Sequence, residues 1–378
     1  MVYIIGAKKL MSSPITRVSA TEMISFHRCR LAWHYGSANR MNIRPKKPAT
    51  ALLFGTGIHE ALAQYYSDNV NPATVFRIWW TQELANLQEQ YPEDLTDLSY
   101  LEEMLGLGVG MLDHYKEWAK SQDNFRVLHT EIEFEVPIID PMTGEDTGGI
   151  LVGRFDGIAK DSIGDIWLLE HKTYYTEPAQ NALLIDAQTG KYQWAAQQLI
   201  RQGAIAGIPK DAILRGAVYN GLRKKLPRKP TLLSSGKGFS KATNIDTTYE
   251  VYLQTILENN FDPNDYIDIL TVLRARGNKF FKREYVRRTQ EELKIIGNRL
   301  AMEYKEMARP DLPIYPSPTR ECPAQCQYFD LCLLEQTGGD NSFLIKYFYE
   351  PRERKGKVYP YPEAVTEQVI EEEISTPF

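Results

Sequence analysis

Cysteine, long apolar runs and excess charge are all scarce in this sequence, and each shortage argues against a class of protein. Only four of the 378 residues are cysteine, too few for a disulfide-built secreted scaffold. No segment approaches the roughly 18 apolar residues needed to span a membrane, and the N-terminus does not read as a signal peptide. A net charge of −5 argues against a generally basic nucleic-acid coat. We therefore expect a cytoplasmic protein with no membrane partner.

Hydrophobic periodicity predicts one α/β core with a helical insertion. A clean period-two run predicts a strand at residues 127–138, and further strands are predicted at residues 150–160, 166–173 and 213–222. Helical spacing predicts helices at residues 19–41, from 52 onward, and at 73–120, 192–207, 247–260 and 264–308. The turn sequence DSIGD joins the second and third strands as a hairpin, and the first three strands are expected to be antiparallel. The helices at 73–120 would form the insertion.

The third predicted strand ends in three groups that are costly to bury, Glu170, His171 and Lys172. Side chains at i and i+2 of a strand point to the same face, so Glu170 and Lys172 project together and His171 points away. Asp156 lies near the end of the neighbouring strand, and the hairpin brings it toward them. Two carboxylates favour Mg²⁺ or Mn²⁺, and a lysine beside them can orient water or offset phosphate charge. The alternative is a surface ion pair.

The motif GRFD, which ends at Asp156, and the later motif EHK, which ends at Lys172, resemble the PD-(D/E)XK nuclease superfamily in its RecB-type exonuclease branch. The resemblance covers residues 19–335 and implies a single restriction-endonuclease-like domain. Its core would be a mixed sheet of four to five strands flanked by helices. Asp156, Glu170 and Lys172 would be catalytic.

Two further positions match this branch in the correct order. His59, in FGTGIHEAL, stands where the family has a histidine that binds the metal with Asp156 and Glu170, although a lone helical histidine is otherwise more often a core residue. Gln193, in YQWAAQ, matches the glutamine motif of the catalytic site. The family usually has a tyrosine four residues later, where this sequence has Gln197.

Three of the four cysteines, Cys322, Cys326 and Cys332, are close in sequence, and Cys29 is far upstream. In a cytosolic protein this pattern favours metal ligation over disulfides. Four thiolates fit a tetrahedral zinc site or a cubane iron–sulfur cluster. A lone cysteine plus a triplet resembles the iron–sulfur nucleases related to AddB and to CRISPR-associated RecB-like exonucleases. This resemblance implies a [4Fe–4S] clasp that joins the N- and C-terminal segments, with zinc and unliganded thiols as alternatives.

The basic segment LRARGNKFFKREYVRR, residues 273–288, interleaves cations with aromatic residues. Cations can follow a phosphate backbone while aromatic rings stack on bases, which favours binding to single-stranded DNA. The alternative is an amphipathic helix with a solvated basic face. The candidate DNA-binding residues are Arg274, Arg276, Lys279, Lys282 and Arg283.

A C-terminal extension spans residues 336–378, and its last seventeen residues hold five acids and no lysine or arginine. We expect this tail, from residue 362, to be disordered. Its end, VIEEEISTPF, resembles the tips of bacterial single-strand-binding proteins, so a recombination or single-strand-binding protein is a candidate partner. A solubilising tail and a segment that folds back over the DNA channel are the alternatives.

Together these patterns predict a metal-dependent exonuclease that hydrolyses phosphodiester bonds in single-stranded DNA or at duplex ends. It would serve recombination, replication or repair. Loops similar to those around residues 222–241 occur in phage-encoded relatives, so we expect a phage origin and action in the host cytoplasm. The alternatives are a structure-specific endonuclease and an inactive DNA-binding adaptor with the same fold.

Overall fold

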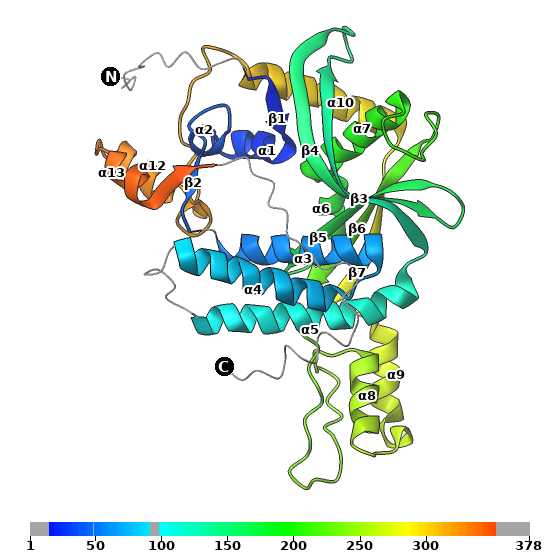
Figure 1. The fold of residues 1–378 in the computed structure, drawn as a ribbon. Helices are drawn as coiled ribbons and strands as arrows, with labels where there is room; N and C mark the ends of the chain where they lie inside the picture. Colours follow the sequence, from blue (N-terminus) through cyan, green and yellow to red (C-terminus); the bar gives the residue numbers. More distant parts are fainter. Residues whose placement is uncertain (1–14, 48, 91–97, 353–378) are drawn as a thin grey trace.

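The centre of the molecule is a mixed six-stranded sheet (Figure 1). The computed structural model describes residues 15–47, 49–90 and 98–352. β1 runs parallel to β4 and β5 parallel to β6, whereas the pairs β3–β4, β4–β5 and β6–β7 are antiparallel. The strand order is β1-β4-β5-β6-β7, with β3 along the other edge of β4. The strands are β1 (Arg17–Ser19), β3 (Phe125–Ile139), β4 (Asp146–Asp161), β5 (Ile166–Tyr174), β6 (Leu214–Arg223) and β7 (Phe281–Arg287).

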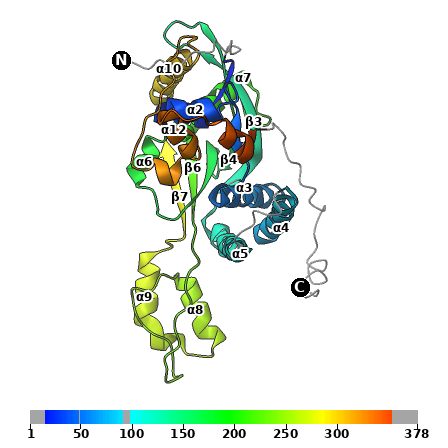
Figure 2. The same cartoon turned by 90° about the vertical axis from the view of Figure 1, so that its left-hand side faces the viewer.

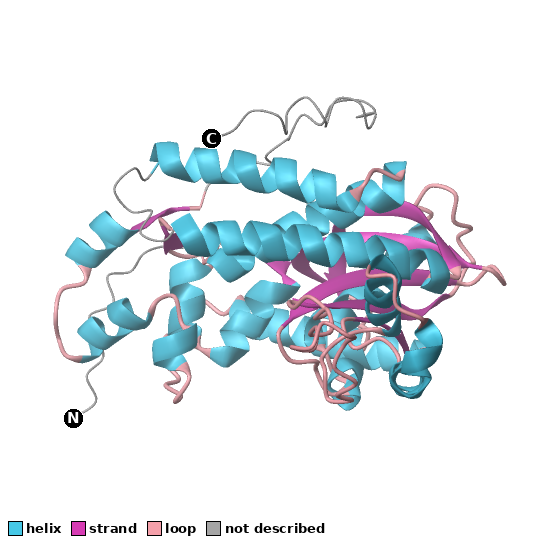
Figure 3. Cartoon of the chain, turned by 90° about the horizontal axis from the view of Figure 1, so that it is seen from below, coloured by secondary structure: helices cyan, strands magenta, loops and turns pink. Residues whose placement is uncertain are grey.

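Helices cover both faces of the sheet and bury a separate apolar cluster on each (Figure 3). One face packs against α1 (Ala20–Arg28), α7 (Ala187–Gln202) and α10 (Gln290–Met307), with the short α6 (Gln180–Leu184) nearby. The other face packs against α3 (Thr50–Asp68), α4 (Pro72–Gln90) and α5 (Leu98–Gln122). No helix within the described part of the chain is long and apolar enough to cross a bilayer.

An arm projects from the sheet between β6 and β7 (Figure 2). It consists of a long loop, α8 (Tyr249–Glu258), a 3₁₀ turn η1 (Pro263–Tyr266) and α9 (Ile267–Arg276). The arm has its own apolar cluster around Tyr252, Tyr266 and Leu273. It therefore packs largely upon itself.

The N- and C-terminal parts of the described chain meet in a small unit that we call the clasp. It contains α2 (Arg30–Gly36), β2 (Ile43–Pro45), α11 (Cys322–Gln325), α12 (Phe329–Gln336), α13 (Ser342–Phe348) and β8 (Tyr349–Pro351). β2 and β8 pair antiparallel, and the Tyr328 hydroxyl donates to the carbonyl of Ile43 at 2.8 Å. The predicted extension from residue 336 thus begins inside this unit, whereas the acidic tail from residue 362 lies outside the described residues.

All four predicted strands are present, and the DSIGD hairpin is confirmed between β4 and β5. Helices α4 and α5 occupy the predicted insertion on either side of residues 91–97, which lie outside the described part. The predicted helix at 19–41 is instead two helices broken at Cys29, whose φ of −163° and ψ of 115° are extended. The predicted helical span 264–308 is wrong in its middle, because Gly277 has a positive φ of 69° and ends α9. β7 follows and pairs with β6 over seven residues.

A buried ion pair joins α7 to α10 and offers a test of this packing. Lys191, which is 2% exposed, lies 2.9 Å from Glu303. The exposed Arg299 approaches the same carboxylate at 3.6 Å. Lys191→Met should lower the free energy of unfolding by about 3 kcal/mol, because Glu303 would stay buried without its lysine. Arg299→Met, the matched control, should cost less than about 1 kcal/mol. Urea unfolding followed by circular dichroism measures both, and equal losses would contradict the assignment.

Candidate active site

Beside Asp156, strands β1 and β5 diverge from the same edge of β4, and we call this opening the fork. The candidate site lies at the fork. Pairing of β4 with β5 ends where Gly157 meets Leu169. On the same edge, β4 pairs with β1 only at residues 150–152. Residues 153–156, the GRFD motif, therefore pair with neither β1 nor β5 on that edge of β4. Glu170 is the first residue of β5 beyond the last β4 pair, so its carboxylate and that of Asp156 stand at the opening of the fork.

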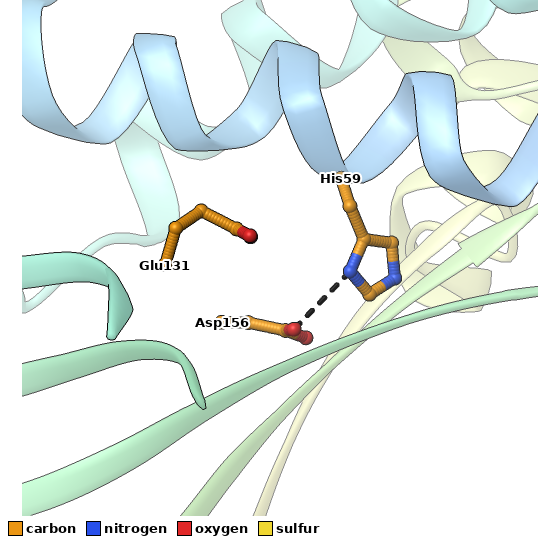
Figure 4. A group of neighbouring side chains, drawn as sticks. All are labelled: His59, Glu131 and Asp156. Atoms are coloured by element: carbon orange, nitrogen blue, oxygen red, sulfur yellow. Dashed lines mark hydrogen bonds and ion pairs between the residues drawn. The ribbon is translucent and has the colours of Figure 1, made fainter. Parts of the chain in front are cut away.

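Helix α3 brings His59 onto Asp156 from one side of the fork (Figure 4). Nδ1 of His59 lies 3.2 Å from one oxygen of Asp156, and the other oxygen accepts the backbone N–H of His171 at 2.7 Å. Burial alone would raise the pKa of Asp156, but the charge and hydrogen bond of His59 hold it well below its usual range. Burial likewise lowers the pKa of His59, yet the attraction of Asp156 leaves it raised overall. Asp156 is therefore an anion at neutral pH.

Glu131 of β3, which no sequence motif indicated, completes this group. His59, Glu131 and Asp156 each offer a ligand atom, and these atoms lie within 4.8 Å of one another (Figure 4). Thr130 pairs with Gly157 and Ile132 with Phe155, so Glu131 stands across from Asp156. Its φ of 52° is left-handed, a strained conformation for a residue other than glycine. Opposite positions in paired strands share a face, so strand register was the signal that could have found this residue.

The third acidic residue at the fork, Glu170, is almost fully buried at 1% exposure. Burial and the nearby charge of Asp156 raise the pKa of Glu170 to about 7. Lys172, two residues further on the same strand, lies 2.6 Å from Oε1 of Glu170 and donates to Gln188 of α7 at 3.2 Å. Burial lowers the pKa of Lys172, but the charge of Glu170 more than offsets this and raises it above its usual value. The lysine is therefore a cation at neutral pH.

The donor set fits a hard divalent cation. Oε1 of Glu131 and Oε2 of Glu170 are buried without a hydrogen-bond partner within the described residues. Burial, with Arg154 only partly compensating, also raises the pKa of Glu131 to about 7. A buried oxygen left without a partner is costly, and carboxylate oxygens with one imidazole are ligands that Mg²⁺ or Mn²⁺ can accept. His59, Glu131 and Asp156 could hold such an ion, and Glu170 could supply one more oxygen.

The two glutamines of the glutamine motif differ in their contacts. Gln193 is 1% exposed, and neither end of its side-chain amide has a hydrogen-bond partner within the described part of the chain. Gln197 accepts the backbone N–H of Leu214 at 3.0 Å and donates to the carbonyl of Ala212. It thereby anchors α7 to the start of β6. At the position where the family usually has tyrosine, Gln197 therefore has a structural role in this chain.

The predicted DNA-binding residues lie on α9, on the following turn and on β7, and most have partners inside the protein. Arg283 has a side chain only 7% exposed. Lys282 pairs with Glu177 and Glu284, Arg274 contacts Tyr249, and Arg276 donates to backbone carbonyls. Lys279 is exposed. Base stacking by the neighbouring phenylalanines is excluded, because Phe280 and Phe281 are 0% and 3% exposed.

The four cysteines line one pocket of about 310 Å³ in the clasp, and none forms a disulfide. Backbone N–H groups of Ser317 and Thr319 donate to the sulfurs of Cys29 and Cys322, and Gln336 donates to that of Cys332. Their sulfurs do not form a group within 4.8 Å of one another, in contrast to the atoms at the fork.

The geometry at the fork agrees with the comparison of this chain with known families. The family model of the PD-(D/E)XK nuclease superfamily matches residues 17–333, from β1 into α12, and the chain belongs to this superfamily. Its members are metal-dependent nucleases that use ions such as Mg²⁺ or Mn²⁺, and membership implies DNA as the substrate. A comparison with curated proteins finds no match.

Substitution at Glu131 tests the metal group. Glu131→Gln should weaken Mn²⁺ binding by at least about tenfold, because one anionic oxygen is lost from the group. Glu133→Gln is the matched control, since Glu133 is exposed two residues further along the same strand. Titration of Mn²⁺ followed by electron paramagnetic resonance measures both affinities. Similar affinities for the two variants would remove Glu131 from the site.

Proposed function

We propose that this protein is a Mg²⁺- or Mn²⁺-dependent DNA exonuclease acting on single strands or duplex ends. The observation that carries the proposal is the fork, where the ligand atoms of His59, Glu131 and Asp156 lie within 4.8 Å of one another and Lys172 lies 2.6 Å from Glu170. A bound Mg²⁺ or Mn²⁺ would supply Lewis acidity toward the scissile phosphate. Asp156, Glu131 and His59 would hold that ion, and Glu170 could supply one more oxygen.

Lys172 has a separate role in this proposal. Glu170 keeps the ammonium group of Lys172 charged, and Gln188 helps to orient this group. A fixed cation beside the metal ligands can position a water for attack and stabilise charge that develops on the phosphate oxygens. Because its pKa is raised, electrostatic stabilisation suits it better than proton abstraction.

The exonuclease mode and a role in recombination, replication or repair are supported by the likeness of GRFD, EHK and the cysteine pattern to the RecB-type branch. A phage origin is supported by the likeness of the loop around residues 222–241 to loops of phage-encoded relatives. The presence of Asp156, Glu170 and Lys172 together argues against an inactive adaptor. A structure-specific endonuclease uses the same chemistry and differs only in how DNA reaches the fork.

Cleavage of linear and circular DNA tests both the chemistry and the mode. Lys172→Met should lower kcat by at least about a hundredfold, because a positioned charge is lost from the transition state, and DNA binding should survive. Lys160→Met is the matched control, since Lys160 is an exposed lysine of β4. The parent should degrade end-labelled linear single strands with Mg²⁺ and leave circular ones intact. Cleavage of circles would instead indicate an endonuclease, and full activity in EDTA would contradict the metal site.

We further propose that the four cysteines hold a [4Fe–4S] cluster in the clasp. Four free thiols on one pocket, with N–H donors on three of the sulfurs, suit such a cluster. Tetrahedral zinc is the alternative, since four thiolates are also a common zinc ligand set. The likeness of the lone cysteine plus triplet to the iron–sulfur nucleases favours the cluster over zinc.

Replacement of one cysteine tests the cluster. Cys326→Ser should abolish the brown absorbance of protein purified without oxygen and lower the thermal midpoint, because ligation is coupled to folding of the clasp. Iron and zinc analysis of the parent identifies the metal. A parent that carries zinc, or no metal, would contradict the cluster while leaving the nuclease proposal intact.

A further inference from the structure

A buried polar network lies behind the metal group, and its centre is Arg283. Its guanidinium donates to the hydroxyls of Tyr66 at 2.8 Å and Tyr115 at 3.0 Å, and also to Asn220 and Asp123. The guanidinium carbon Cζ of Arg283 lies 4.7 Å from the ring centroid of Trp118. We define the Arg283 network as six residues: Tyr66, Tyr115, Asp123, His171, Asn220 and Arg283. They come from α3, α5 and the chain that follows it, β5, β6 and β7.

The network reaches the metal group first through α3. Tyr66 follows His59 by seven residues, which is two helical turns, so both side chains lie on one face of α3. The Tyr66 hydroxyl shares a hydrogen bond with Tyr115 at 2.7 Å and donates to Asp123 at 3.0 Å. These bonds fix the rotation and height of α3 over the sheet, and therefore the position of His59.

The second connection runs through β5. The ring of His171 stacks on that of Tyr66, with centroids 5.8 Å apart and planes 11° apart, and its Nδ1 lies 2.7 Å from the Asn220 amide. The backbone N–H of the same residue donates to Asp156. The Arg283 network therefore includes Tyr66, on the helix that carries His59, and His171, whose backbone N–H donates to Asp156.

We propose that the Arg283 network positions the metal ligands, with Tyr66 and Arg283 acting as positioning residues for the nuclease site. The proposal rests on the nuclease function proposed above. A buried arginine is not needed for stability alone, since apolar replacements of buried ion pairs are often neutral. Partners behind metal ligands are also known to tune affinity, because they fix ligand orientation. The basic sequence around Arg283 predicts contact with DNA, whereas the structure surrounds this arginine with protein groups.

Tyr66→Phe tests this role because it removes one hydroxyl and keeps the ring stacked on His171. We expect Mn²⁺ affinity to fall by about tenfold, with kcat reduced and KM for DNA unchanged. Tyr65→Phe is the matched control, since Tyr65 is the preceding residue of α3 and its ring contacts that of Tyr66, whereas its hydroxyl makes no hydrogen bond to the six network residues. Arg283→Lys provides a second variant, which keeps the charge but cannot donate to four partners at once, and we expect the same loss of affinity.

Titration of Mn²⁺ followed by electron paramagnetic resonance measures the Mn²⁺ affinity of the ligand group without DNA. Thermal melting in EDTA measures whether the fold is intact. Loss of affinity in Tyr66→Phe and Arg283→Lys, with cooperative melting and normal binding in Tyr65→Phe, supports the proposal. Parental affinity in both variants overturns it, even if the melting temperature falls, and leaves the nuclease function standing if the parent cleaves DNA. A parent that neither binds Mn²⁺ nor cleaves DNA overturns both.

Discussion

Repulsion among three carboxylates confined at the fork of the sheet is the constraint on which the surrounding structure depends. Each carboxylate has one cationic neighbour: His59 beside Asp156, Arg154 beside Glu131 and Lys172 beside Glu170. These partners suffice for Asp156, whose pKa stays low, but the pKa values of Glu131 and Glu170 still rise to about 7. Charge at the fork is therefore only partly compensated. A divalent cation would complete the compensation, which connects the burial of these groups to metal-dependent chemistry.

The sheet creates this confinement by changing partners along one edge of β4. Short pairing with β1 and later pairing with β5 leave the GRFD segment between them. Gly153 has a steric role there, because a Cβ at this position would lie 2.7 Å from the ring of Phe134. The helices then act from both faces, α3 with His59 and α7 with Gln188. The clasp and the arm lie outside the fork, and none of their described residues contributes to it.

The Arg283 network shows how a basic residue in a basic stretch can take an internal role. Arg283 and Lys282 are adjacent on β7, where alternate side chains face opposite sides of the sheet. Lys282 pairs with the exposed Glu177 and the half-buried Glu284, whereas Arg283 enters the space between the sheet and helices α3 and α5. Composition cannot distinguish these two outcomes, because they depend on which face of β7 is covered.

The sequence by itself determined what local periodicity and motif spacing encode: the four long strands, the β4–β5 hairpin, and the shared direction of Glu170 and Lys172. These follow from interactions between near neighbours in the chain. Only the tertiary structure decided the rest. Strands β1 and β7, the place of Glu131 opposite Asp156, and the burial of Arg283 depend on pairing and packing between distant segments, since strand register and the cover of each face decide where a side chain points.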